Sequence, residues 1–249
     1  MFFIKNGSNT KKKKNAWFCI ACVCIFSMAL TVRAFAEEIE ASPIQQGSDE
    51  NIILSEEELA EINRNIASTI TAERLLVVLK AYSLEGEVSY YWGGKSSAIG
   101  WDKRWGKQSY VTSEGSRTTG TLRTFGLDCS GYVNWVFNNA MKKDVTLKVG
   151  NGTTSQWAKS SAVSWNDAQP GDLAFFYDPI NFSGINHVGI VVGKNDKNEL
   201  LVAHCSSSYN NVVITETEST GFKYIRTPDI YEDAGVADKI YRATSSYKK

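Results

Sequence analysis

The sequence predicts an α+β fold in which N-terminal helices pack on an antiparallel sheet. Apolar residues recur every three or four positions in the first part of the chain, most clearly over residues 72–84 and 129–140, as in helices with one buried face. Short apolar runs separated by turn residues follow over residues 173–226, as in buried strands. Helices that precede strands along the chain are typical of the α+β class.

Residues 1–36 have the features of a secretory signal peptide. Lys5 and four lysines at 11–14 precede an uncharged apolar run over residues 16–32, and Ala34-Phe35-Ala36 resembles a cleavage site. We therefore expect cleavage before Glu37 and a protein that is secreted or at the cell wall, with membrane contact only through this segment. An uncleaved anchor is the alternative, because the run is near the short limit of about 17–25 residues for a membrane span.

The charge of the remaining chain argues against nucleic acid as a partner. The full chain has 27 basic and 27 acidic residues, and the predicted signal peptide removes basic residues but no acidic ones. An acidic protein does not favour a polyanionic partner such as nucleic acid or anionic lipid. We expect a monomer without a bound cofactor, and the length suits one domain with a short N-terminal extension.

Residues 37–69 are predicted to form a linker and an N-terminal helix, and residues 70–245 the main domain. Ser55 and Glu58 form a capping box that starts the first helix, which runs to about Ser68. Thr71 is the expected cap of a second, mostly apolar helix at 72–84.

A long polar segment separates this helix from the next one. The aromatic run at 90–92 ends at two glycines, which predict a turn. Residues 95–127 follow and carry Trp101 and Trp105. The two indoles either form a substrate wall or cover a local apolar patch, and the sequence leaves both open.

The second half of the chain is predicted to form an antiparallel meander. Residues 142–168 are expected to be irregular. The expected strands are 173–177, 187–192, 199–204, 212–217 and 222–226, with a further one at 240–242.

Cys129 is the candidate nucleophile. It lies at the start of the helix predicted over 129–140, where unpaired N–H groups and the helix dipole favour a thiolate and lower the thiol pKa. Gly131 lets neighbouring chain or substrate approach closely. The alternative is a buried, inert cysteine.

The chain contains two histidines, and a hairpin brings them together. If Val192 pairs with Glu199 across the turn at 193–198, His187 and His204 lie directly opposite each other on one face of the sheet. A slip by one residue would place them on opposite faces. We assign His187 as the base, because it opens its strand beside a loop, and His204 as the group that orients it.

Cys205 leaves two other interpretations open. Strand alternation points its side chain away from the face of His204. If His204 faces Cys129, a Cys129–Cys205 disulfide is disfavoured. A zinc site from Cys129, His187, His204 and Cys205 is disfavoured for the same reason.

Five ordered motifs resemble the NlpC/P60 family of papain-like cysteine peptidases, which act on bacterial cell walls. They are Tyr-Tyr-Trp-Gly-Gly at 90–94, Leu-Asp-Cys-Ser-Gly-Tyr-Val at 127–133, Gln-Pro-Gly-Asp-Leu at 169–173, His-Val-Gly-Ile-Val at 187–191 and Val-Ala-His at 202–204. The resemblance covers about residues 70–245 and implies a papain-like core. Two features depart from the family pattern, Ser89 in place of a proline and a longer spacer between Gly94 and Asp128.

The resemblance implies a secreted hydrolase of peptidoglycan stem peptides that cuts between D-glutamate and a diamino acid. Its triad would be Cys129, His187 and His204. The implied substrate-binding residues are Tyr90, Trp92, Asp128 and Ser130. A carboxylate at Asp128 would also suit a substrate with a free amino end.

Three alternatives to this function stay open. The same fold class hosts thiol-dependent acyl transfer to an amine. A non-catalytic cell-wall-binding protein would keep the groove without the activity. An inert secreted domain with a disulfide would lack a reactive thiol.

Overall fold

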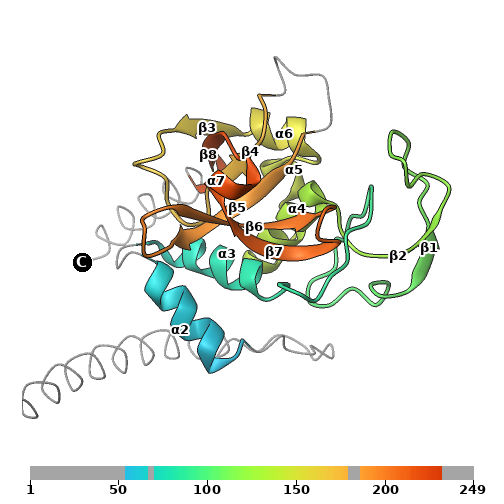
Figure 1. Ribbon diagram of the computed structural model, residues 1–249, viewed down its shortest axis with the longest axis horizontal. Coiled ribbons are helices and arrows are strands. Elements are labelled where there is room, and N and C mark those ends of the chain that lie inside the picture. The colour runs from blue at the N-terminus through green and yellow to red at the C-terminus, as the bar shows by residue number, and fades with distance from the viewer. Residues whose placement is uncertain (1–53, 67–69, 179–185, 232–249) are drawn as a thin grey trace, which may run out of the picture. The chain divides into compact units, whose positions relative to one another are not determined.

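The protein has the predicted α+β fold. The computed structural model describes residues 54–66, 70–178 and 186–231. Within them an antiparallel sheet has the strand order β3-β8-β4-β5-β6-β7 (Figure 1). Its strands are β3 (Ser160–Val163), β4 (Leu173–Phe175), β5 (Val188–Lys194), β6 (Leu200–Ser206), β7 (Asn211–Glu216) and β8 (Tyr224–Pro228).

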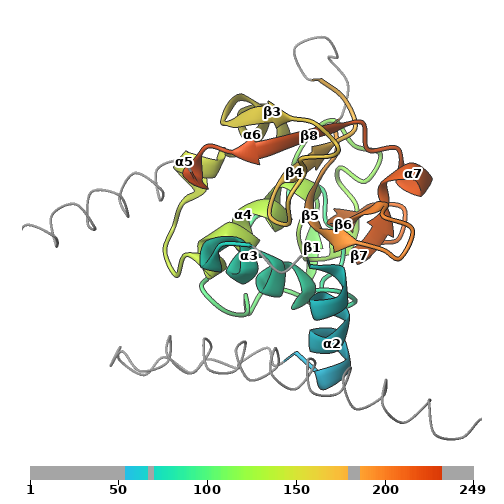
Figure 2. The ribbon, with the colours of Figure 1, turned by 90° about the vertical axis from the view of Figure 1, so that its left-hand side faces the viewer.

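The longer helices cover one face of this sheet. The longer ones are α2 (Glu56–Asn65), α3 (Ala72–Tyr82) and α4 (Cys129–Ala140), and the short ones are α5 (Thr146–Val149), α6 (Thr153–Ala158) and α7 (Thr217–Thr220). Both α3 and α4 pack against β5, as Figures 1 and 2 show. The predicted caps are confirmed: Ser55 and Glu58 form the capping box of α2, and the Thr71 hydroxyl accepts from the N–H of Arg74 in α3.

Some predictions fall outside the described residues, namely the signal peptide at 1–36, the linker up to residue 53 and the strand at 240–242. In the part of the chain that is described, no helix has the length and apolar character needed to cross a membrane.

The predicted meander is confirmed for β4 to β7, but two parts of the prediction are wrong. Strand β8 returns to pair with β4 and β3 rather than continuing beyond β7. The segment 142–168 is not irregular, since it forms α5, α6 and β3. These elements were missed because they are only four to six residues long, too short for a clear periodic pattern.

The hairpin of β5 and β6 closes at Lys194 and Leu200 rather than at the predicted pair Val192 and Glu199. Its turn closes where the N–H of Asn195 donates to the carbonyl of Glu199, and Lys194 pairs with Leu200. A bulge then shifts the register between Val191 and Gly193. Together the displaced turn and the bulge offset the pairing at the histidines by two residues from the predicted register, so both histidines keep their predicted common face.

Helix α4 is buried on every side, not only on its apolar face. The insertion at 95–127 accounts for this. The Asn139 side chain of α4 accepts from the N–H of Gly100 at 2.6 Å and donates to the carbonyl of Ala98 at 3.0 Å. The insertion therefore covers the polar side of the helix.

The two tryptophans of the insertion form an anchor rather than an exposed wall. Trp101 and Trp105 contact edge to face at 4.9 Å, and Trp105 lies 5.6 Å from Trp135 of α4. Trp105 is only 5% exposed. Further along the insertion, β1 (Gln108–Tyr110) and β2 (Leu122–Thr124) pair as a small antiparallel hairpin.

Candidate active site

The chain approaches the start of α4 very closely at two glycines. The N–H of Tyr91 donates to the carbonyl of Leu127 at 2.8 Å, and the N–H of Asp128 donates to the carbonyl of Gly94 at 3.0 Å. A Cβ on Gly131 would lie 2.1 Å from the Gly94 carbonyl oxygen. The predicted close approach at Gly131 is therefore made by neighbouring chain.

Asp128 is the N-cap of α4. Its Oδ1 atom accepts from the Gly131 N–H at 2.7 Å and from the Ser130 hydroxyl at 2.9 Å, so it satisfies an orphan donor at the helix start. Lys95 completes this cluster, because its ammonium contacts both Asp128 and Ser130. Sequence reasoning missed Lys95, although it directly follows the two glycines that predict the turn.

The Cys129 thiol is buried beside this cluster, with 7% of the residue exposed. Burial raises its pKa to about 12, and the Asp128 carboxylate adds to the rise. The N–H groups of Val188 and Ser130, together with Lys95, act in the opposite direction. The prediction of a lowered thiol pKa is therefore wrong, because the loss of hydration outweighs the helix terminus.

The two histidines are in direct contact. The Nε2 atom of His187 lies 2.8 Å from the Nδ1 atom of His204. The prediction that they share a face is confirmed, but they are diagonal rather than directly opposite, owing to the shifted register. Phe176 and Phe222 pack against the His187 ring, and Phe222 also against His204.

Apolar surroundings keep both imidazoles neutral at pH 7. Burial lowers the pKa of His187 to about 3, with a further contribution from His204, and that of His204 to about 4. His204 is only 2% exposed, whereas His187 keeps part of its surface accessible. Of the two, His187 is the imidazole that a substrate can reach.

Hydrogen bonding determines which nitrogen of each ring carries the proton. The Thr220 hydroxyl donates its single hydrogen to the carbonyl of Glu216 at 2.6 Å. In its contact with the Thr215 hydroxyl, where the two oxygens are 3.2 Å apart, Thr220 is therefore the acceptor. Thr215 must then accept from the Nε2–H of His204, at 3.0 Å. His204 Nδ1 therefore accepts from His187 Nε2–H, which leaves Nδ1 of His187 as the basic nitrogen.

Sequence reasoning did not find the two threonines of this relay. Thr215 lies on β7 opposite Val202, diagonal to His204. Strand alternation places such a residue on the same face as His204, and only the register between β6 and β7 identifies which residue it is.

The thiol lies where the chain enters β5. Of the two N–H groups that face Sγ, one belongs to Val188, the residue after His187. Among the described residues, no hydrogen bond joins Sγ to either imidazole. Such contacts are often long in a free site and shorten when substrate binds.

Cys205 points away from the face of His204, as predicted, but the condition that His204 faces Cys129 does not hold. Cys205 belongs to the same core cluster as Cys129, on the α4 side of the sheet, whereas His204 packs on Phe222 on the other side. The Cys205 thiol donates to the carbonyl of Leu127 at 3.1 Å, and both cysteines are free.

The other predicted substrate-binding residues divide into two groups. Tyr90 lies near the nucleophile, since Cys129 and Asp128 add to the effect of burial in raising the pKa of its phenol. The Trp92 indole instead donates to the carbonyl of Glu114 at 2.8 Å, so the insertion holds it.

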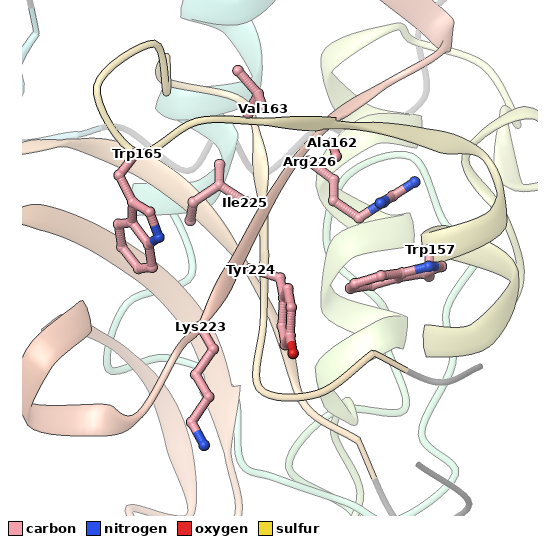
Figure 3. Close-up of a pocket in the computed structure, with 8 residues that line it drawn as sticks. All are labelled: Trp157, Ala162, Val163, Trp165, Lys223, Tyr224, Ile225 and Arg226. Atoms are coloured by element: carbon pink, nitrogen blue, oxygen red, sulfur yellow. The ribbon is translucent and has the colours of Figure 1, made fainter. Parts of the chain in front are cut away.

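A hollow of about 330 Å³ lies over β3 and β8 (Figure 3). The indole of Trp157 meets Tyr224 edge to face at 5.4 Å, and the Arg226 guanidinium lies 4.3 Å from an aromatic centroid of Trp157. The predicted catalytic and substrate-binding residues are not among those that line it.

Comparison with known proteins identifies a family. The model described as "NlpC/P60 family" matches residues 87–227. A relative named probable endopeptidase p60, from Listeria grayi, is 38% identical over 92 residues, which are 34% of this chain and 16% of the relative. Gamma-DL-glutamyl hydrolase of Bacillus subtilis is 32% identical over 74 residues, which are 30% of this chain and 17% of the relative.

Solved structures of NlpC/P60 domain proteins are also similar to this chain, at low identity. The peptidoglycan hydrolase RipB of Mycobacterium tuberculosis is 22% identical, with a TM-score of 0.43 and 83% of each chain covered. RipD of the same organism, described as a non-catalytic NlpC/p60 domain protein, is 20% identical, with a TM-score of 0.43, and the match covers 64% of this chain and 98% of that one.

Proposed function

Because the chain belongs to the NlpC/P60 family, we propose that it is a secreted cysteine hydrolase that cleaves stem-peptide bonds of bacterial peptidoglycan. Cys129 is the nucleophile, His187 the general base and His204 the group that orients the base. The observation that carries this proposal is the contact between His187 Nε2 and His204 Nδ1 at 2.8 Å. It is joined by a cysteine at a helix start, whose Sγ faces the N–H of the residue after His187.

The reaction starts from a neutral pair, since the thiol pKa is raised and the His187 pKa is lowered. Nδ1 of His187 takes the thiol proton as Sγ attacks the carbonyl carbon of the scissile amide. Backbone N–H groups in the first turn of α4 then stabilise the oxyanion. The amine leaves with the proton from His187, and water hydrolyses the remaining thioester.

The proposed bond joins D-glutamate to a diamino acid. The name of the Bacillus subtilis relative, a gamma-DL-glutamyl hydrolase, supports a glutamyl bond. Tyr90 and Ser130 lie beside the nucleophile and are suited to bind the substrate near the scissile bond. The matched relatives are much longer than this match, so the activity proposed for this chain needs its own test.

The proposal is tested with purified muropeptides, whose products are identified by mass spectrometry. The wild-type protein is expected to release new stem-peptide fragments, and Cys129→Ala is expected to release none. Cys205→Ala is the matched control, because Cys205 is also a buried free thiol but has no proposed role in the reaction. Intact muropeptides with a still reactive Cys129 would instead indicate acyl transfer or wall binding.

A further inference from the structure

The ammonium group of Lys95 occupies the place where Asp128 was expected to bind a substrate amine. Lys95 Nζ lies 2.6 Å from Asp128 Oδ1 and 2.5 Å from the Ser130 hydroxyl. An alkyl ammonium of the protein therefore makes the charge-assisted hydrogen bonds that the amino end of a peptide would make.

The Lys95 side chain runs across the first turn of α4 to reach this place. A Cβ on Gly131 would lie 3.1 Å from Lys95 Cδ, so the methylene chain passes close over the glycine. The Asp128 side chain is 11% exposed and that of Lys95 39%. Lys95 thus covers the carboxylate and itself faces solvent.

The Oδ1 atom of Asp128 has little capacity left for a second cation. Its Oδ1 atom accepts from the Gly131 N–H, from the Ser130 hydroxyl and from Lys95. A substrate ammonium that binds between Asp128 Oδ1 and the Ser130 hydroxyl would have to displace Lys95. Anywhere else on this carboxylate it would lie close to the Lys95 charge, which repels it. An N-terminus without a positive charge meets no such cost.

We propose that Lys95 is a specificity-determining residue that replaces the substrate amine at Asp128 and Ser130. The site then accepts stem peptides whose N-terminus is acylated, as it is while the peptide remains attached to the glycan strand, in preference to peptides with a free amino end. This inference rests on the proposed function, because it concerns the substrates of the same site.

The test compares two synthetic peptides that differ only at the N-terminus. One is L-alanyl-γ-D-glutamyl-diamino acid with a free amine, and the other is its N-acetylated form. The ratio of kcat/KM for the free peptide to that for the acetylated peptide is measured for the wild type and for Lys95→Met, which removes the charge at similar length. Lys107→Met is the control, since Lys107 is an exposed lysine of the same insertion.

The wild type is expected to cleave the acetylated peptide at least as well as the free one. Lys95→Met is expected to raise the free-to-acetylated ratio at least ten-fold, because it leaves the Asp128 carboxylate open to the substrate amine. Adding Asp128→Asn to this variant is expected to abolish the gain. A ratio that is the same in the wild type and Lys95→Met, or a wild type that prefers the free amine, would overturn the inference.

Binding separates this inference from the proposed function. In a Cys129→Ala background, calorimetry measures the affinity for both peptides without turnover. Lys95→Met is expected to tighten binding of the free peptide about ten-fold and to leave the acetylated peptide unchanged. If Lys95→Met tightens binding of the free peptide but the wild-type protein cleaves neither peptide, the proposed hydrolase is refuted and the role of Lys95 in specificity stands. If the wild type cleaves the peptides but Lys95→Met changes neither affinity, the hydrolase stands and the role of Lys95 is refuted.

Discussion

The hydrogen-bond relay behind His204 predicts that Thr220, which touches no reacting atom, affects the reaction rate. The Thr220 oxygen takes the hydroxyl hydrogen of Thr215, which makes Thr215 an acceptor toward His204. The substitution Thr220→Val removes this oxygen at nearly constant shape. The Thr215 hydroxyl then turns toward His204 Nε2 and donates to it.

This reversal selects the unproductive tautomers. If His204 Nε2 accepts, its Nδ1 carries the hydrogen and donates to His187, whose own Nδ1 is then protonated and unable to act as base. In Thr220→Val, the productive arrangement with His204 protonated at Nε2 would leave the Thr215 hydroxyl hydrogen without an acceptor. An unsatisfied group of this kind costs about 1 kcal/mol, the low end of the usual range, because Thr215 is partly exposed. That cost corresponds to about a five-fold loss of kcat/KM.

The assay is kcat/KM on the stem peptide that the wild-type protein cleaves, together with the ¹⁵N chemical shifts of both imidazoles. Thr220→Ser keeps the hydroxyl and is expected to retain the wild-type rate and shifts. A Thr220→Val protein with the wild-type rate, or with His204 still protonated at Nε2, would refute the reasoning. Equal thermal unfolding temperatures for the two variants would exclude a change of fold as the cause.

Three further predictions concern the same site. His204→Ala is expected to retain at least ten-fold more activity than His187→Ala, because orienting the base contributes less than the base itself. Equal residual rates would contradict this division of roles between the two histidines. Stability toward urea is expected to fall as the pH drops from about 6.5 to about 3, since the unfolded chain then binds protons that the buried imidazoles do not. The histidines would not be the cause if the urea midpoint did not change with pH over this range, or if it changed as strongly after both histidines were replaced by Asn. Gly189→Ala is expected to destabilise the fold by about 1–3 kcal/mol, because its Cβ would lie 2.4 Å from Val202 Cγ1 and 3.0 Å from His204 Cβ. An unchanged urea midpoint would contradict this prediction, since it would mean that the strands move apart at no cost in stability.

Local signals predicted much of the site. The helix that starts at Cys129 and the place for a close approach at Gly131 were both predicted from residues next to the thiol, because a helical period or a glycine has the same meaning in any fold. The shared face of His187 and His204 was also predictable, because alternation along a strand survives a register shift of two residues.

The register itself was not predictable, because two irregularities changed it. The Asn195 side chain accepts from the N–H groups of Lys197 and Glu199 and so narrows the turn, and a bulge follows between Val191 and Gly193. The turn alone would have placed the histidines on opposite faces. The bulge removes one residue of that offset and restores their common face.

The sequence by itself determined the fold class, the long helices and most strands, and it identified the thiol motif at Cys129 and both imidazoles, because periodicity, caps and motifs depend on neighbouring residues. Tertiary structure decided the properties that depend on atoms brought together from distant segments. The thiol pKa is raised because burial removes water from Cys129. This burial cannot be predicted from the residues at the helix start alone. Lys95 reaches Asp128, and Thr215 reaches His204, only because the insertion and β7 fold back onto the site.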